Sequence, residues 1–499
     1  MQLPFLALGK KAHPAGDLQK NEFDVYWEGI LSKDKDWREK MYRKNAWEKY
    51  TEKEQAAVMA FGEGYKDFLT KGKTERACVK QALQMAKEKG FRELSEVTGR
   101  GKLLKAGDKV YVCNRDKNIA LFVIGAKPLE EGLRILGAHI DSPRLDLKQN
   151  PLYESEGFAL LDTHYYGGIK KYQWVTLPLA LHGTVIKKDG TRIDLAIGEK
   201  EEDPVFGISD LLIHLAADQL KTAGAKVVEG ENLDVTVGSI PLKEEDKDAV
   251  KKNVLRILKE SYGIEEEDFL SAEIEVVPSG KARDCGLDRS MVMGYGHDDR
   301  VCAYASLKAL LDVEACEYTN CCFLVDKEEI GSVGATGAQS LFMENTIAEL
   351  VACMEGESML KTRRALACTK MLSSDVSAAV DPLYLSVTEK KNAAFLGHGV
   401  VFNKYTGARG KSGCNDADPE YIAQLRRVLD DGKVNYQTAE LGKVDQGGGG
   451  TIAYIMGNYV MHVIDAGVPV INMHAPWEII SKADLYEAYQ AYKLFLAEI

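Results

Sequence analysis

Histidine or carboxylate side chains occur in five short segments of the sequence, each where a strand should end or a helix begin. These residues are His139 and Asp141; Asp298; Glu328 and Glu329; Asp375; and His474. Imidazole and carboxylate groups form a ligand set that zinc, cobalt or manganese can accept. The residue types therefore predict a centre for two divalent metal ions, provided that the fold brings the five segments together.

Each segment also has an ordinary structural explanation. A single histidine such as His139 or His474 is commonly packed in a core, and adjacent acids at a helix start, such as Asp298 and Asp299, often cap the helix. The acids that follow an apolar run at 323–325 could form a solvated loop. Asp141 favours the metal interpretation, because a carboxylate that accepts the second ring N–H of a histidine fixes a metal-bound imidazole.

The second half of the sequence predicts the element order that could position these residues. Strands and helices alternate here, with a helix at 300–313, a strand at 320–325, a helix at 335–343 and a strand at 350–354. Such alternation predicts a mostly parallel sheet covered by helices on both faces. Ligands in such folds bind at the carboxyl ends of the strands, so we expect the five segments to meet at that edge.

The first half of the sequence predicts two further regions. Residues 1–100 look helical, with a capping box at Thr51 and Glu54 and a second helix that ends at Gly90. Strands are expected at 110–113, 120–124 and 133–138. Residues 150–287 instead predict strands at 174–181, 183–186, 191–196 and 273–277, with helices at 210–223 and 246–262. A last amphipathic helix follows Ser481.

The chain length predicts more than one domain, because single cores stop growing at about 250–300 residues and this chain has 499. The change in pattern places a β-rich domain at 148–287, inserted into a second domain formed by 1–147 and 288–499, which carries the five segments.

Composition excludes several classes of partner. The 64 basic and 76 acidic residues give a net charge of −12, which disfavours nucleic acid and anionic membranes as partners. No apolar run is long enough to span a membrane, and the N-terminus lacks the basic start of an export signal. The ten cysteines form no CxxC pair, so we expect reduced, mostly buried thiols in a cytoplasmic protein.

Three familiar patterns do not explain the sequence. The stretch 407–412 looks like the end of a phosphate loop, but Tyr405 occupies the position of the first required glycine. Gly448, Gly450 and Ala453 fit a dinucleotide fingerprint without the preceding strand or the later acid. The sequence also contains no HExxH motif.

The five segments together resemble the M18 family of metallo-aminopeptidases, which includes aspartyl aminopeptidase and its bacterial relatives. The matching stretches are AHIDSPRLDLK, GHDDRVCAYASL, DKEEIGSVGATGAQS, SSDVSAAVDP and INMHAPWEIISKADLYEAY, in order and spacing. The resemblance implies that Asp298 bridges two metal ions. One ion would be completed by His139 and Asp375, and the other by Glu329 and His474. Glu328 would be the general base, and Asp141 would orient His139.

The resemblance also implies an architecture and an assembly. It implies a three-layer α/β/α zinc-peptidase domain with an inserted β-rich dimerisation domain, whose dimers assemble into a tetrahedral dodecamer. His214 would reach the active site of a neighbouring subunit, where a peptide substrate binds. Zinc is the expected metal, with cobalt or manganese as alternatives.

Substrate preference is where this chain departs from the aspartyl-selective members. Those members carry a histidine at the position of Ala378 and a His-Pro pair where this chain has Asp381-Pro382. A neutral or broad preference for the N-terminal residue is therefore at least as well supported as an acidic one. Family placement also suggests Lys404, Tyr405 and Arg409 as lining residues. The glycines at 447–450 either open a helix near the substrate pocket or form a turn.

Two other functions fit the same residues. The metal chemistry could serve a deacylase of N-acyl amino acids, which needs no free amine. The chain could also be a non-catalytic homologue that keeps the fold for assembly, although the intact Glu328, Asp141 and ligand candidates argue against this.

Overall fold

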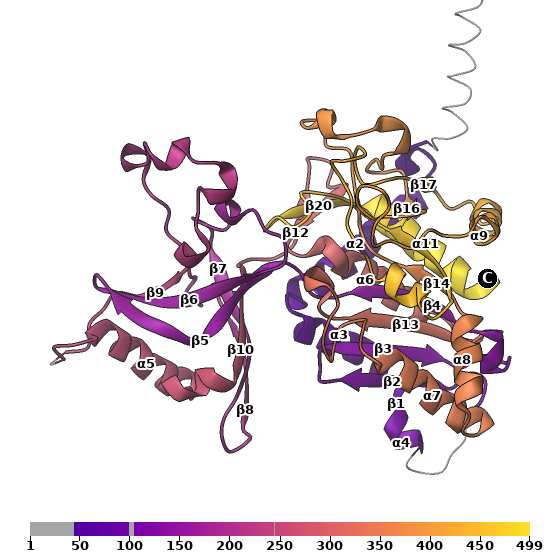
Figure 1. The fold of residues 1–499 in the computed structure, drawn as a ribbon, viewed down its shortest axis with the longest axis horizontal. Helices are drawn as coiled ribbons and strands as arrows, with labels where there is room; N and C mark the ends of the chain where they lie inside the picture. Colours follow the sequence, from indigo (N-terminus) through magenta and orange to yellow (C-terminus); the bar gives the residue numbers. More distant parts are fainter. Residues whose placement is uncertain (1–43, 99–103, 244) are drawn as a thin grey trace, which may run out of the picture. The chain divides into compact units, whose positions relative to one another are not determined.

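A computed structural model describes residues 44–98, 104–243 and 245–499 of the chain (Figure 1). All of its helices and strands lie in the compact unit that begins at Asn45. The predictions for residues 1–43 and 99–103 fall outside the described residues. Within the described ranges, no helix is both long and apolar enough to cross a membrane.

The largest sheet has nine strands in the order β1-β2-β3-β13-β4-β14-β18-β16-β17. Their bounds are β1 Arg92–Glu93, β2 Lys109–Asn114, β3 Asn118–Val123, β4 Arg134–His139, β13 Asn320–Val325, β14 Lys370–Ser373, β16 Val400–Asn403, β17 Tyr436–Thr438 and β18 His462–Gly467. The four central strands β13, β4, β14 and β18 are parallel. Their carboxyl ends therefore share one edge of the sheet.

Helices cover both faces of this sheet, which makes it the middle of three layers (Figure 1). Alternate residues of the buried strands enter two separate cores: Leu121 and Leu136 pack on one face, whereas Phe122 and Ile135 pack on the other. The first face is covered by α2 Glu52–Lys71, α3 Glu75–Glu88, α6 His297–Leu311, α9 Pro419–Asp431 and α11 Lys482–Glu498. The second is covered by α4 Leu94–Thr98, α7 Phe342–Glu355, α8 Met359–Ala367 and α10 Ala453–Gly457.

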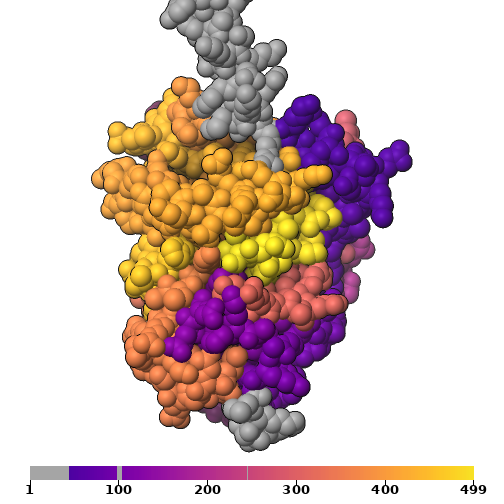
Figure 2. All heavy atoms as spheres, turned by 90° about the vertical axis from the view of Figure 1, so that its right-hand side faces the viewer, coloured from indigo at the N-terminus to yellow at the C-terminus, as the bar shows by residue number. Residues whose placement is uncertain are grey.

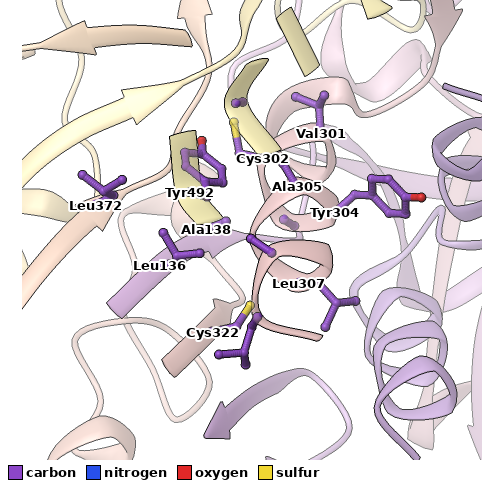
Figure 3. Packing of buried hydrophobic residues seen from close by; sticks show 14 of the residues in the cluster. Leu136, Ala138, Val301, Cys302, Tyr304, Ala305, Leu307, Cys322, Leu372 and Tyr492 are labelled. Carbon is purple, nitrogen blue, oxygen red and sulfur yellow. The ribbon is translucent and has the colours of Figure 1, made fainter. Parts of the chain in front are cut away.

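Helix α6 is buried nearly all round and lies at the centre of the first core. Figure 3 shows Cys302, Ala305 and Leu307 of this helix among side chains from β4, β13 and β14, with Tyr492 of α11 beside them. Figure 2 shows α11, in yellow, directly beside the orange surface of the stretch that contains α9. A helix without a polar face needs such complete cover, so α6 is held firmly where its N-terminus enters the site.

Two smaller sheets complete the fold. An antiparallel sheet has the order β8-β7-β10-β5-β6-β9. Its strands are β5 Arg144–Ser155, β6 Phe158–Tyr166, β7 Leu179–Ile186, β8 Arg192–Ile197, β9 Val235–Gly238 and β10 Ala272–Pro278. Helix α5 Ala249–Tyr262 packs on this sheet (Figure 1). The third sheet has the order β11-β12-β20-β19-β15, and its strands are β11 Arg283–Cys285, β12 Met291–Gly294, β15 Ser377–Ala378, β19 Pro469–Ile471 and β20 Glu478–Ser481.

Most predicted elements agree with the structure. Thr51 and Glu54 form the expected capping box at the start of α2, and Gly90 has φ +84 just beyond α3. The strands around 110, 120, 135, 193, 275 and 322 are all present, as are the charged helix α5 and the last helix α11. In α6, Asp298 and Asp299 have non-helical backbone angles, so the regular helix begins at the predicted Arg300.

The predicted helix at 335–343 and strand at 350–354 are wrong. A single helix, α7, starts at Phe342 and runs through the supposed strand. Met343, Ile347, Leu350 and Val351 are all buried in the second core. Their spacing of i, i+4, i+7 and i+8 matches one helical face. This periodicity outweighs the local β preference of the stretch at 350–354.

The predicted helix at 210–223 is also wrong. The structure has two short 3-10 helices there, Ile213–Leu215 and Gln219–Lys221. Leu212, Ile213 and Leu215 are 54%, 66% and 67% exposed. Helix formation in water depends mainly on packing of an apolar face, and these side chains find no such surface among the described residues.

Two smaller predictions need correction. The strand predicted at 174–181 begins only at Leu179, and it continues through 183–186 as the single strand β7. All ten cysteines are free of disulfides, as expected, but only Cys78, Cys302, Cys321 and Cys322 are buried, and Cys368 is exposed.

Candidate metal centre

The five segments with histidine and carboxylate groups meet in the structure. His139 is the last residue of β4, Glu328 and Glu329 follow β13, and Asp375 follows β14. Asp298 lies at the start of α6, and His474 follows β19. Parallel strand ends thus supply three of the segments, as the alternating pattern predicted. We call the six residues His139, Asp298, Glu328, Glu329, Asp375 and His474 the strand-end cluster.

Asp298 lies between the two histidines. Its Oδ1 is 3.1 Å from Nε2 of His139, and its Oδ2 is 3.2 Å from Nε2 of His474. Asp375 Oδ1 lies 3.9 Å from the first of these nitrogens, and Glu329 Oε2 lies 3.5 Å from the second. The residues therefore form two groups, and in each group three candidate ligand atoms lie within 4.8 Å of one another. The first group is His139, Asp298 and Asp375, and the second is Asp298, Glu329 and His474. The structure thus places one carboxylate between two possible cation positions.

Asp141 connects His139 to the segment that carries Glu328. Nδ1 of His139 is 3.1 Å from the backbone oxygen of Asp141 and 3.3 Å from its Oδ1. The backbone N–H groups of Glu328 and Glu329 donate to the Asp141 carboxylate at 3.1 and 3.2 Å. A single buried carboxylate therefore sets the position of both strand ends relative to each other.

Glu478 is a contributor that the sequence analysis missed. Its carboxylate accepts hydrogen bonds from the backbone N–H groups of His474, at 2.7 Å, and Asp298, at 3.0 Å. It is buried at the start of β20. A carboxylate four residues after His474 and directly before the apolar pair Ile479-Ile480 is the signal that could have revealed it.

Among the described residues, the carboxylates of the strand-end cluster form ion pairs only with the two histidines of the cluster. Burial raises the pKa of Glu328 to about 7, and burial also raises the pKa of Asp375 and of Glu329. Oε1 of Glu329 is buried without a hydrogen-bond partner. Among the described residues, no lysine or arginine forms an ion pair with the cluster's carboxylates.

The pKa values of the two histidines are also raised, but for a different reason. Burial alone would lower the pKa of His139 and of His474, but their neighbouring carboxylates outweigh it. Burial alone would lower the pKa of His474, but its contact with Asp298 raises this pKa to about 10. Imidazole and carboxylate donors that face a common point, with an unpaired buried oxygen among them, fit divalent cations such as zinc.

A second group of acidic residues is paired with lysine and arginine side chains. Glu75, Glu273 and Glu275 also bring carboxylate oxygens within 4.8 Å of one another. However, Lys117 Nζ lies 2.8 Å from Glu75, and Arg144 lies 3.5 Å from Glu75 and 3.3 Å from Glu275. We call these five residues the ion-pair cluster. Its positive charges come from the chain itself, so it needs no metal ion.

The remaining candidate residues lie elsewhere. His214 is exposed in the 3-10 helix Ile213–Leu215 and belongs to neither ligand group. Tyr405 and Arg409 line a cavity of about 210 Å³ together with Gly447 and Gly448. Lys404 instead pairs with Asp416 at 3.3 Å. The glycines precede α10, which begins at Ala453.

The chain matches one family of known proteins over most of its length. Residues 68–496 match the family model described as "Aminopeptidase I zinc metalloprotease (M18)". A "Probable M18 family aminopeptidase 1" of Clostridium acetobutylicum is 60% identical over 91% of this chain and 98% of its own length. A protein of the same description from Thermotoga maritima is 48% identical over 92% of this chain and 100% of its own.

Solved structures give the same result. A crystal structure of an M18-family aminopeptidase from Thermotoga maritima superposes with a TM-score of 0.88 at 46% identity, covering 92% of this chain and 100% of that one. A crystal structure of aminopeptidase I from Clostridium acetobutylicum gives 0.86 at 58% identity, covering 91% and 99%. With matches of this extent and identity, the chain belongs to the M18 family of zinc metallo-aminopeptidases.

Proposed function

We propose that this aminopeptidase removes N-terminal residues from peptides at a centre of two divalent cations built on the strand-end cluster. The observation that carries this proposal is the position of Asp298, whose two carboxylate oxygens each face a different histidine. His139 and Asp375 would complete one cation site, and Glu329 and His474 the other. Zinc fits this donor set, and cobalt or manganese could replace it.

Bound cations would supply Lewis acidity toward the scissile carbonyl and make a water molecule more acidic. Glu328 would take the proton from that water and deliver it to the leaving amine. Its carboxylate lies 4.0 Å from His139 Nε2, and burial raises its pKa to about 7. A general base works best with a pKa near the operating pH. Asp141 holds the backbone of Glu328 and thereby aims its side chain.

The variant Glu328→Gln tests this role. We expect kcat to fall by about 10²–10⁴-fold, because the amide cannot accept the proton. Metal content, measured by atomic emission, should remain that of the wild type. The exposed Glu357 provides a matched control, Glu357→Gln, which should keep full activity. A Glu328→Gln enzyme with normal kcat would refute the assignment.

The reaction class is tested with paired substrates. An aminopeptidase needs a free α-amino group, so aminoacyl-anilides should be hydrolysed and N-acetyl amino acids should not. Hydrolysis of the acetylated compounds alone would favour the deacylase. A metal-loaded protein that hydrolyses no member of a peptide panel would favour the assembly homologue. Neither alternative is supported by the comparisons.

We propose that the enzyme prefers peptides whose N-terminal residue is neutral or basic. A cavity of about 330 Å³ is lined by Ala378, Asp381, Tyr384 and Glu440, and its lining in the described part of the chain contains no lysine, arginine or histidine. Ala378 lies three residues after Asp375, close in sequence to the cation ligand. An acidic side chain would meet like charge there. Leu-, Met- and Lys-anilides should therefore have higher kcat/KM than Asp- and Glu-anilides, and the reverse order would exclude this cavity as the specificity pocket.

We further propose that the chain forms a homo-oligomer in the cytoplasm and that residues 148–287 mediate its dimer contacts. The antiparallel sheet spans Arg144–Pro278, and Val205, Leu212, Ile213, Leu215 and Leu220 beside it are more than half exposed. Such a patch is typical of an interaction surface. A yeast structure of the same fold, 19% identical with a TM-score of 0.72, is described as a dodecamer.

Sedimentation of the wild type and of a Leu212→Asp/Leu215→Asp variant tests this assembly. We expect the charged variant to sediment as smaller species. If His214 reaches a neighbouring site, His214→Ala should lower kcat/KM without changing sedimentation. A monomeric, fully active wild type would refute both statements.

A further inference from the structure

The segment from Tyr166 to Gly168, at the end of β6, lies beside both histidines of the strand-end cluster. It contacts Asp141, which holds His139, and it contacts His474 directly. Tyr166 is 7% exposed, and its hydroxyl donates to Asp141 Oδ2 at 2.7 Å. Two residues later, the backbone oxygen of Gly168 lies 3.0 Å from Nδ1 of His474. One short segment of the antiparallel sheet therefore reaches each half of the proposed metal centre.

These contacts determine which nitrogen of each histidine carries hydrogen. A backbone oxygen can only accept, so Nδ1 of His474 must donate to Gly168. Nε2, which faces Asp298 and Glu329, is then the nitrogen that can give up its proton to a cation. Nδ1 of His139 faces two oxygens of Asp141 and must donate as well. Both Nε2 atoms are thereby prepared to bind a cation, and such partners fix the orientation and raise the basicity of histidine ligands.

Tyr166 acts on His139 through Asp141. The Asp141 carboxylate also accepts the backbone N–H groups of Glu328 and Glu329. Without the tyrosine hydroxyl, Oδ2 would keep a single donor, the 3.2 Å bond from Glu329. The carboxylate could then rotate away from the imidazole. Burial raises the pKa of Tyr166, so its hydroxyl remains a donor.

The segment is itself held tightly. The Arg144 guanidinium lies 3.9 Å from the centre of the Tyr166 ring, and Glu75 and Glu275 fix this arginine. Gly167 has φ +74, and a Cβ added there would lie 3.4 Å from Cβ of Glu329. A Cβ on Gly168 would lie 3.4 Å from Nδ1 of His474. Glycine at these two positions lets the backbone approach the ligands closely.

We infer that residues 166–168 are a positioning element that presets both histidine ligands, so that the antiparallel sheet controls the metal affinity of the active site. The inference rests on the metal centre proposed above. It assigns Tyr166 to the cation bound by His139, and Gly168 to the cation bound by His474. The two halves of the centre should therefore respond separately to changes in this one segment.

Stepwise zinc affinity of the full-length protein, measured by competition with a coloured chelator, tests the inference. Tyr166→Phe should weaken one of the two binding steps by about 10–100-fold. The matched control is Tyr165→Phe, because Tyr165 is the preceding residue of β6 and is 43% exposed. Both binding steps of that control should equal those of the wild type.

Gly168→Val should weaken the other step. A Cβ at this position would already be in van der Waals contact with Nδ1 of His474, at 3.4 Å, so the two methyl groups of valine would add bulk against the imidazole. Gly224→Val is its control, since a Cβ there meets no atom within 4 Å. In the double variant Tyr166→Phe/Gly168→Val, both steps should be weak. A general structural defect would weaken both steps in each single variant, and that outcome overturns the inference.

Cobalt spectroscopy gives a second measurement that does not depend on turnover. The visible bands of the cobalt-loaded protein should change in Tyr166→Phe and remain unchanged in Tyr165→Phe. A wild type that binds two zinc ions tightly, with a Tyr166→Phe variant of equal affinity and spectrum, would refute the positioning element alone. A wild type that binds no divalent ion would instead refute the proposed metal centre and the inference with it.

Discussion

Two buried groups of acids in this protein are compensated in different ways. The ion-pair cluster surrounds Glu75 with Lys117 and Arg144, so burial of its carboxylates is offset by charges of the same chain. The strand-end cluster buries carboxylates of similar number without any lysine or arginine partner among the described residues. Buried charge is costly unless it is paired. The difference supports the proposal that the strand-end cluster, and not the ion-pair cluster, binds cations from outside the chain.

Asp298→Asn should produce the largest effect, because the bridging position then loses its negative charge. We expect kcat/KM to fall at least about 10³-fold, equivalent to about 4 kcal/mol. Bound zinc should fall in parallel, as measured by atomic emission. Asp218→Asn, at a side chain that is 98% exposed, is the control. Full zinc content in Asp298→Asn would show that the two groups do not differ as described.

Glu75→Gln should lower stability and leave the zinc content intact, because Glu275 still holds Arg144 at 3.3 Å beside Tyr166. The change leaves Lys117 and Arg144 with less compensation in a buried place. We expect stability to fall by about 3–5 kcal/mol, seen as an earlier midpoint in urea. Glu52→Gln is a matched control, because Glu52 is also the first residue of its helix but is exposed. Loss of zinc from Glu75→Gln, with normal stability, would contradict this assignment.

Removal of metal with a chelator should separate the two groups directly. A cation at 100 times its Kd adds about 2.7 kcal/mol to the stability of the folded state. The thermal midpoint of the wild type should therefore fall when EDTA is added. Glu75→Gln should show the same fall from its lower starting value. Equal midpoints of the wild type with and without EDTA would exclude a tightly bound cation.

The exposed ion pair of Lys71 and Asp67 serves as a comparison for the buried ion pairs. Its removal should give the smallest change in stability. Its side chains are 54% and 63% exposed, at 2.7 Å separation. Lys71→Ala should change stability by no more than about 0.5 kcal/mol in the same urea measurement. A loss close to that of Glu75→Gln would mean that burial does not explain the sensitivity of the ion-pair cluster.

The sequence predicted which histidines and carboxylates would meet better than it predicted several elements of the fold. His139, Asp298, Glu329, Asp375 and His474 could be selected because each follows an apolar run or precedes a helix, and parallel strand ends share an edge. Which oxygen faces which nitrogen could not be predicted, since this depends on side-chain orientation. Tyr166 had no signal of its own, because its contact with Asp141 depends on where β6 runs.

The errors in the fold have a common physical origin. At 350–354 the residues prefer strands locally, but four buried positions at helical spacing in α7 decide the structure. At 210–223 the residues prefer a helix, yet no apolar surface among the described residues covers its leucines. In both stretches tertiary packing overrides local preference, and packing is what a single sequence shows least directly.

The contact between Gly168 and His474 joins residues that are 306 positions apart in the chain. During synthesis, the ribosome releases β4 and its histidine long before the last ligand exists. A nascent chain, or one truncated ahead of residue 474, would therefore hold an incomplete peptidase centre. Any peptidase activity that depends on His474 would therefore arise only after the segment that carries this histidine has been made.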